Sequence, residues 1–247
     1  MIDLNRLGKV SVNTQGCEMC IIEYNHARDC TIKFYNTETI LFKKYYRDFM
    51  LGLIKDPYHP HVYNVGFIGI GNFSNKTHRR IYHIWNNMLS RCYNEKERVK
   101  HPTYIGCSVD ERWHNFQNFA EWYENNYKEY MEGWQLDKDI LCKECRIYSS
   151  ETCALVPKEV NYLLLKADKI RGFLPIGVNI SLSNYASRLT KNNKLIHIGS
   201  FKTVEEAFQA YKMAKEQHIK EVADKWRGKI TEKVYNALIN YKIEIDD

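Results

Sequence analysis

Short apolar runs, several of them alternating with polar residues, fill the first 72 residues. The predicted strands lie at residues 9–12, 19–24, 30–35 and 39–42, with turn-forming residues between them. Strands this short and evenly spaced favour a small barrel or curled sheet. We therefore expect a β-rich, barrel-like N-terminal module over residues 1–72.

The pattern changes after residue 72, where apolar residues recur every three or four positions. This spacing predicts helices over 77–94, with Trp85 and Leu89 on the inner face, and over 115–130. Two strand-like segments follow at 134–141 and 146–148, and then a helix that opens at Pro157, a residue suited to the first turn. We expect residues 73–170 to form a central core.

The last 77 residues, 171–247, read as a separate unit of sheet and helix. Strands are predicted at 177–181, 185–190 and 194–201, the last two joined as a hairpin. Thr203 followed three residues later by Glu206 is a capping box that begins a long helix, and a final helix is expected over 231–241. The overall class is α+β.

Composition is that of a globular protein, with 44% hydrophobic and 27% charged residues. The formal net charge of +6 is mildly basic and does not by itself identify a polyanion partner. No apolar run approaches ~18 residues, which argues against a membrane span. Because the N-terminus lacks an apolar signal-peptide core, a cytoplasmic location is expected.

Eight cysteines in such a protein should be reduced, metal-bound or buried. Cys142 and Cys145 have the spacing of zinc ligands, but a second close pair is missing. The remaining ligands of a structural zinc would come from Cys92, Cys107 or Cys153, and plain thiols are the favoured alternative. Cys17 and Cys20 share the spacing, but on a strand they would face opposite sides.

The central region resembles a family of phage-encoded HNH-like nucleases, and several separated pieces match in the right order over about 80 residues. The matching segments are 85–94, Trp113 with Phe116 and Phe119, 136–140, 148–153, and Val156-Pro157 with Asn161. The resemblance implies a strand–strand–helix (ββα) core that holds one divalent metal. It also implies an origin in a phage or mobile element, and hence the cytoplasm of a host cell.

The C-terminal region resembles the Apetala-type DNA-binding fold, a three-stranded sheet with a helix. The matching segments are Gly177-Val178, 185–189, 198–201 and 203–211. By this resemblance the sheet would lie in the major groove of double-stranded DNA. Its expected DNA-binding residues are Tyr185, Ser187, Arg188, Lys191 and Lys194; the alternative is a set of solvated hairpin side chains.

The HNH resemblance assigns Asp137, Asp139 and Asn161 to catalysis. Asp139 and Asn161 would bind Mg²⁺ or Mn²⁺ through hard oxygen ligands, with Asn161 on the helix that follows the ribbon. The alternatives are solvated carboxylates at the end of a strand and an ordinary polar residue on a helix surface.

Two departures from the family pattern leave two functions open. The position of the usual histidine base lies in Asp137-Lys138-Asp139, and the turn that tends to carry Gly-Asn reads Glu144-Cys145. The first candidate is a metal-dependent DNA endonuclease. The second is an inactive relative that acts by binding DNA or protein, as a regulator or as an inhibitor of a host defence system. Mixed charges along 205–225, Lys215 among them, indicate a solvated helix face.

Overall fold

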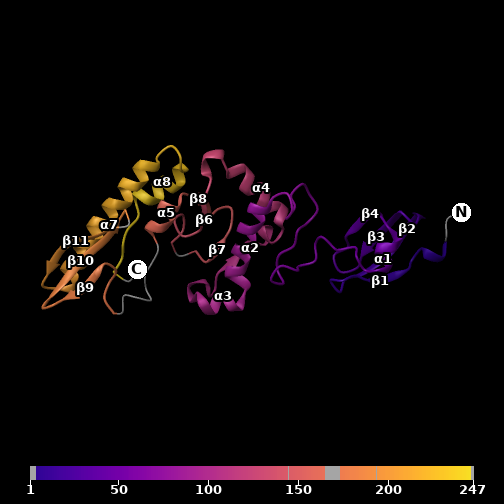
Figure 1. Ribbon diagram of the computed structural model, residues 1–247, viewed down its shortest axis with the longest axis horizontal. Coiled ribbons are helices and arrows are strands. Elements are labelled where there is room, and N and C mark those ends of the chain that lie inside the picture. The colour runs from indigo at the N-terminus through magenta and orange to yellow at the C-terminus, as the bar shows by residue number, and fades with distance from the viewer. Residues whose placement is uncertain (1–3, 144, 165–172, 193, 246–247) are drawn as a thin grey trace. The chain divides into compact units, whose positions relative to one another are not determined.

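A computed structural model describes residues 4–143, 145–164, 173–192 and 194–245, as a mixed α+β chain with several small sheets (Figure 1). Glu144, at one of the two departures from the family pattern, lies outside the described residues. Contacts divide the chain into two compact units, Met1–Asn126 with Arg146–Ser149, and Tyr127–Cys145 with Ser150–Asp247. The three modules expected from the sequence, with boundaries at residues 72 and 170, stay a prediction.

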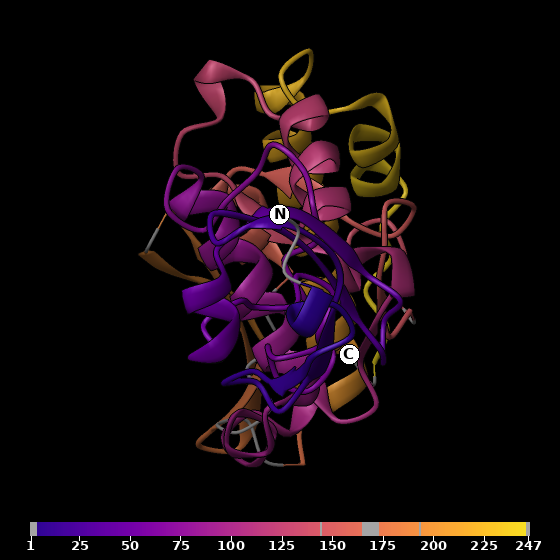
Figure 2. The same ribbon diagram turned by 90° about the vertical axis from the view of Figure 1, so that its right-hand side faces the viewer.

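The N-terminal strands form a four-stranded antiparallel sheet in the order β1-β2-β3-β4, viewed from the N-terminal side in Figure 2. The elements are η1 Leu4–Arg6, β1 Val10–Val12, β2 Glu18–His26, β3 Asp29–Phe34, β4 Ile40–Lys44 and α1 Tyr46–Met50. The expectation of a barrel is wrong, because the described residues show no pairing between β1 and β4. Phe49 of α1 and Ile54 instead join the apolar cluster of this open sheet.

The helices predicted for the middle of the chain are confirmed in the first unit. The elements are α2 Arg79–Tyr93, α3 Glu95–Lys100, η2 Pro102–Tyr104, β5 Ser108–Val109, η3 Glu111–His114 and α4 Phe116–Asn126. Trp85 is wholly buried and its indole nitrogen donates to the Trp113 carbonyl at 2.7 Å. Phe116 packs on Trp85 with ring centroids 5.3 Å apart, so aromatic contacts join α2 to α4.

The predicted second strand of the ribbon does not pair with the first. β7 Ile147–Tyr148 runs parallel to β5 in the first unit. The partner of β6 Gln135–Asp137 is β8 Ala154–Val156, in antiparallel register, and helix α5 Lys158–Leu163 follows directly. β8 is buried along its whole length. It therefore offers β6 a more apolar partner strand than the 146–148 segment, in which Ile147 is exposed.

The three C-terminal strands and both predicted helices are confirmed in the second unit. They are β9 Val178–Ser181, β10 Asn184–Lys191, β11 Lys194–Phe201, α7 Val204–Trp226 and α8 Glu232–Ile239, with η4 Glu129–Met131 earlier in the chain. α7 lies along the sheet (Figure 1), which has the order β11-β10-β9. A Cβ at Gly177 would lie 2.0 Å from the Tyr211 ring, so only glycine permits this approach of strand to helix.

None of the helices in the described part of the chain combines the length and apolar character that a membrane crossing needs.

Candidate functional site

The strand–strand–helix unit places its polar residues where the first strand ends. Gln135 pairs with Val156 and Asp137 with Ala154, and Pro157 leads from β8 into α5. Because side chains alternate along a strand, Gln135 and Asp137 lie on one face of β6. We refer to β6, β8 and α5 as the ββα unit.

Asp137 is tied to the turn that follows β6. Its Oδ1 accepts hydrogen bonds from the backbone N–H of Asp139 at 2.9 Å and of Ile140 at 2.8 Å. Burial raises the pKa of Asp137, and the charge of Asp139 adds to the rise, while the two backbone bonds oppose it. One oxygen of this carboxyl group therefore holds the turn in place.

Asp139 is paired with its neighbour Lys138. The Lys138 side chain is buried, and its ammonium contacts Asp139 Oδ1 and lies 3.5 Å from the carbonyl oxygen of Cys145. The Asp139 side chain is 55% exposed, so its carboxylate also reaches solvent. A positive charge thus already touches the carboxylate that the family resemblance assigns to a metal.

Asn161 is brought from α5 to the first strand. Its Nδ2 donates to Gln135 Oε1 at 2.6 Å, so the helix residue contacts the same face of β6 that carries Asp137. Sequence reasoning missed Gln135, although its position two residues before Asp137 is the signal that places it there. The structure records no contact between Asn161 and Asp139 among the described residues.

The donors around the end of β6 are carboxylate and amide oxygens, which suit Mg²⁺ or Mn²⁺. No cluster of three or more His, Cys, Asp or Glu side chains in the described ranges has metal-site geometry. Besides the carboxylates of Asp137 and Asp139, the amide oxygen of Asn161 is the ligand that the family resemblance assigns to the helix. The residue types fit a hard divalent cation.

The predicted zinc pair is oxidised in the structure. Cys142 and Cys145 form a disulfide, and in this state neither sulfur is a thiolate ligand. The other candidate ligands, Cys92, Cys107 and Cys153, are buried thiols. Cys17 and Cys20 are buried as well.

The five residues predicted to bind DNA do not share one environment. Ser187 is wholly buried and its hydroxyl has no hydrogen-bond partner among the residues that the structure describes, so in this conformation it is not available to a duplex. Lys191 donates to Glu221 Oε2 on α7 at 2.5 Å. Tyr185 is half-buried and Lys194 is exposed at the start of β11.

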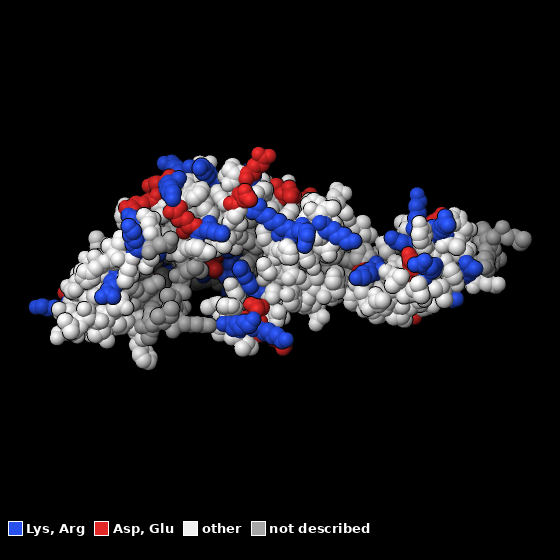
Figure 3. Space-filling model, in the orientation of Figure 1, with Lys and Arg blue, Asp and Glu red and all other residues white. Residues whose placement is uncertain are grey.

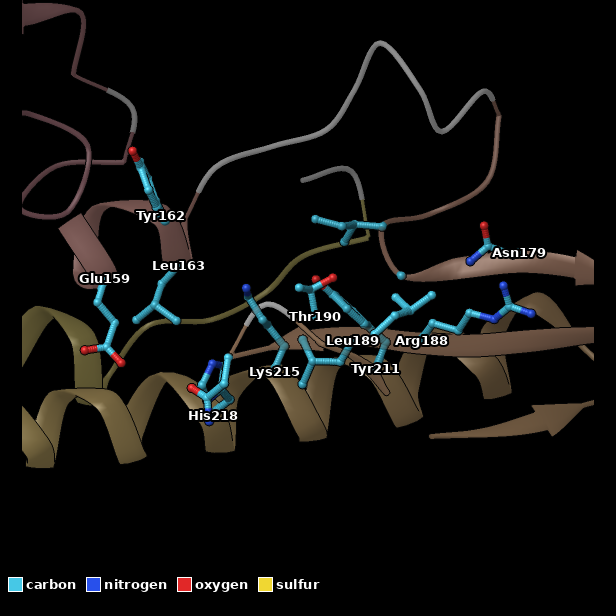
Figure 4. A pocket seen from close by; sticks show the side chains of 14 residues that line it. Glu159, Tyr162, Leu163, Asn179, Arg188, Leu189, Thr190, Tyr211, Lys215 and His218 are labelled. Atoms are coloured by element: carbon cyan, nitrogen blue, oxygen red, sulfur yellow. The ribbon is translucent and has the colours of Figure 1, made fainter. Parts of the chain in front are cut away.

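Arg188 has a different setting, because it lines a cavity between the sheet, α5 and α7 (Figure 4). Lys215 and His218 on α7 line the same cavity, and sequence reasoning missed both. The expectation of a solvated face is therefore wrong for Lys215, which is half-buried. The one sequence signal for burial of Lys215 is its spacing: it lies four residues after buried Tyr211 and four before buried Ile219, on the same helix face.

Comparison with protein-family models, with curated proteins and with solved structures finds no match for this chain. The family resemblances are therefore carried by the residues quoted for them.

Proposed function

We propose that this chain binds duplex DNA through its C-terminal sheet and cuts one strand at the ββα unit with the help of one divalent cation. The observation that carries the proposal is the order β6–β8–α5, with Asp137 and Asp139 at the end of the first strand and Asn161 hydrogen-bonded to that strand. A nuclease of a phage or mobile element would use both parts of the chain, the C-terminal sheet to bind DNA and the ββα unit to cut it.

Each residue of the unit has a distinct part in this proposal. Asp139 and Asn161 would hold the cation, which when bound supplies charge stabilisation at a phosphate oxygen. Asp137 fixes the turn that presents Asp139. Lys138 holds the Asp139 carboxylate in place through contact with its own ammonium. Since segment 136–140 has no histidine, we expect slow turnover, because loss of a general base costs ~10²- to 10⁴-fold in rate.

Nicking of supercoiled plasmid in Mn²⁺ tests the proposal. The purified chain should convert supercoiled to open-circular DNA, and Asp139→Ala should lower the rate by ~10²-fold or more, because the cation loses its charged ligand. Glu124→Ala removes an exposed carboxylate on α4 and should nick at the wild-type rate. Equal nicking by wild type and Asp139→Ala would reject the assignment of the site.

A second candidate is a DNA-binding protein without catalysis, and the contact between Lys138 and Asp139 favours it. A buried ammonium already neutralises the carboxylate, which weakens the case for a metal ion at the same oxygen. Such a protein would act as a regulator or as an inhibitor of a host defence protein. It predicts salt-sensitive binding to duplex DNA, or a tight protein complex, and no nicking by wild type in Mg²⁺ or Mn²⁺.

A further inference from the structure

A cavity of about 770 Å³ lies within the second compact unit, between α5, the three-stranded sheet and α7 (Figure 4). Its size is within the range of small-molecule sites, roughly 300–1,000 Å³. Leu163, Leu189 and Tyr211 provide apolar walls, and Arg188, Lys215 and His218 provide nitrogen donors. The cavity therefore combines an apolar wall with groups that attract anions.

The cavity has an excess of basic side chains. Glu159 is the one acid among its described lining residues, and that carboxylate is already occupied. Lys225 Nζ lies 2.9 and 2.6 Å from its two oxygens, and the indole nitrogen of Trp226 donates to it at 2.8 Å. No acid that the structure describes in the lining is therefore left to neutralise Lys215 or Arg188.

Lys215 extends from α7 into this cavity (Figure 4). Burial lowers the pKa of its ammonium, and the described residues provide it with no hydrogen bond or ion pair. A charged group taken out of water without a partner destabilises the fold. An anion in the cavity would supply the missing partner.

His218 lies one turn further along α7, on the same side of the helix as Lys215. It is 7% exposed, and its Nδ1 has no hydrogen-bond partner among the described residues. The nearest acid oxygen, Glu221 Oε2, is 3.8 Å away and accepts a hydrogen bond from Lys191. Lys215 and His218 thus both line the cavity, and neither the Lys215 ammonium nor His218 Nδ1 has a hydrogen-bond acceptor among the described residues.

We propose that this cavity binds a nucleotide phosphate, with the phosphate at Lys215 and His218 and the nucleoside against Leu163, Leu189 and Tyr211. A phosphate offers several acceptor oxygens and a charge of about −1.5 to −2 at pH 7, which matches two donors a helical turn apart. The nucleotide is either free or at the end of a DNA strand. This site is distinct from Asp137, Asp139 and Asn161, and it does not depend on cleavage at the ββα unit.

Titration calorimetry with four probes tests the site: thymidine 5′-monophosphate, inorganic phosphate, and one duplex ending in either 5′-phosphate or 5′-hydroxyl. We expect saturable binding of the nucleotide or of the 5′-phosphorylated duplex. Lys215→Met and Lys215→Gln should weaken that binding about tenfold or more, because a charge-assisted hydrogen bond is lost. Lys220→Met changes an exposed lysine on the same helix and should bind as wild type does.

The probes separate the two sources of the ligand. Binding of the free nucleotide supports a soluble ligand, and preference for the 5′-phosphorylated over the 5′-hydroxyl duplex supports a strand end. The proposal is overturned if neither the nucleotide nor the 5′-phosphorylated duplex binds. It is also overturned if both Lys215 variants bind as wild type does, or if inorganic phosphate binds as tightly as the nucleotide. Asp139→Ala should retain the wild-type affinity for the nucleotide, so failure of the nicking test leaves this result intact.

Discussion

At the scale of single residues, the Lys215 ammonium opposes folding of the chain without ligand. The pKa of this lysine is lowered by burial, so folding disfavours its charged form. For a base with a lowered folded-state pKa, the stability deficit is fully present below the folded pKa. It disappears as the pH rises through the folded pKa to the unfolded value. At neutral pH the deficit is therefore present.

Lys215→Met should raise the free energy of unfolding at neutral pH by about 0.5–2 kcal/mol, the common range for stabilising substitutions. The methionine keeps most of the apolar stem and removes the charge. Urea denaturation followed by circular dichroism measures the change, with Lys220→Met as the control expected to stay within about 0.5 kcal/mol of wild type. A destabilised Lys215→Met would mean that the ammonium has a structural partner, and it would weaken the proposed phosphate site.

The same residue shows where a linear sequence stops being informative. Lys215 belongs to a helix face on which basic and acidic residues alternate, and such a pattern predicts solvent on that side. The cavity exists because α5 packs near α7, and α5 lies about 50 residues earlier in the chain. No local pattern around residue 215 carries that information.

At the scale of elements, Thr203 sets the start of α7 through local contacts alone. Its hydroxyl accepts from the Glu206 N–H at 3.2 Å, and the Glu206 carboxylate accepts from the Thr203 N–H at 3.3 Å. Thr203→Ala should therefore lower the stability of the second unit by about 1 kcal/mol. Amide hydrogen exchange in the first turn of α7 reports the change residue by residue.

Thr203→Ser keeps the capping oxygen and is the matched control. It should preserve protection of the first-turn amides, while the alanine variant loses it. Equal exchange in both variants would show that packing of Ala207 and Phe208 against the sheet, and not the cap, holds the end of the helix.

Elements whose pattern is local were predictable, and those that depend on a distant partner were not. The capping box, helices α2 and α4 and the β10–β11 hairpin follow from spacing within about 20 residues. The sequence predicts a ribbon made of the two strand candidates 134–141 and 146–148, which one short turn separates. In the structure β7 pairs with β5, which ends 38 residues before β7 begins, and β6 pairs with β8. No periodicity in the sequence encodes which strand pairs with β6.

The candidate site was predictable in part for the same reason. The family resemblance assigns Asp137 and Asp139 to the first strand of the core, and β6 ends at Asp137. The hydrogen bond from Asn161 to Gln135 and the contact of Lys138 with Asp139 emerge only when strand, turn and helix are assembled. The sequence also does not distinguish the open N-terminal sheet from a barrel, since strand lengths are similar in a barrel and in a curled sheet.

At the scale of the whole molecule, the +6 charge is a poor guide to where DNA would bind. Figure 3 shows Lys and Arg side by side with Asp and Glu over the region of α7 and α8. Lysines of this unit form ion pairs with acids: Lys191 pairs with Glu221, and Lys225 pairs with Glu159. Basic groups in ion pairs release few counterions on binding, so the unpaired ones should dominate affinity.

Lys194 is the exposed lysine of the β10–β11 hairpin, and the described residues give it no ion pair. If the sheet contacts the duplex, Lys194→Ala should weaken binding about equally for all sequences. It should also reduce the slope of log K against log salt by about 0.9, the value for one phosphate contact. Fluorescence anisotropy with a labelled duplex at several salt concentrations measures this slope. Lys220→Ala, on the mixed-charge helix, should leave it unchanged; the reverse result would assign the DNA contact to α7 and remove the basis for a sheet in the major groove.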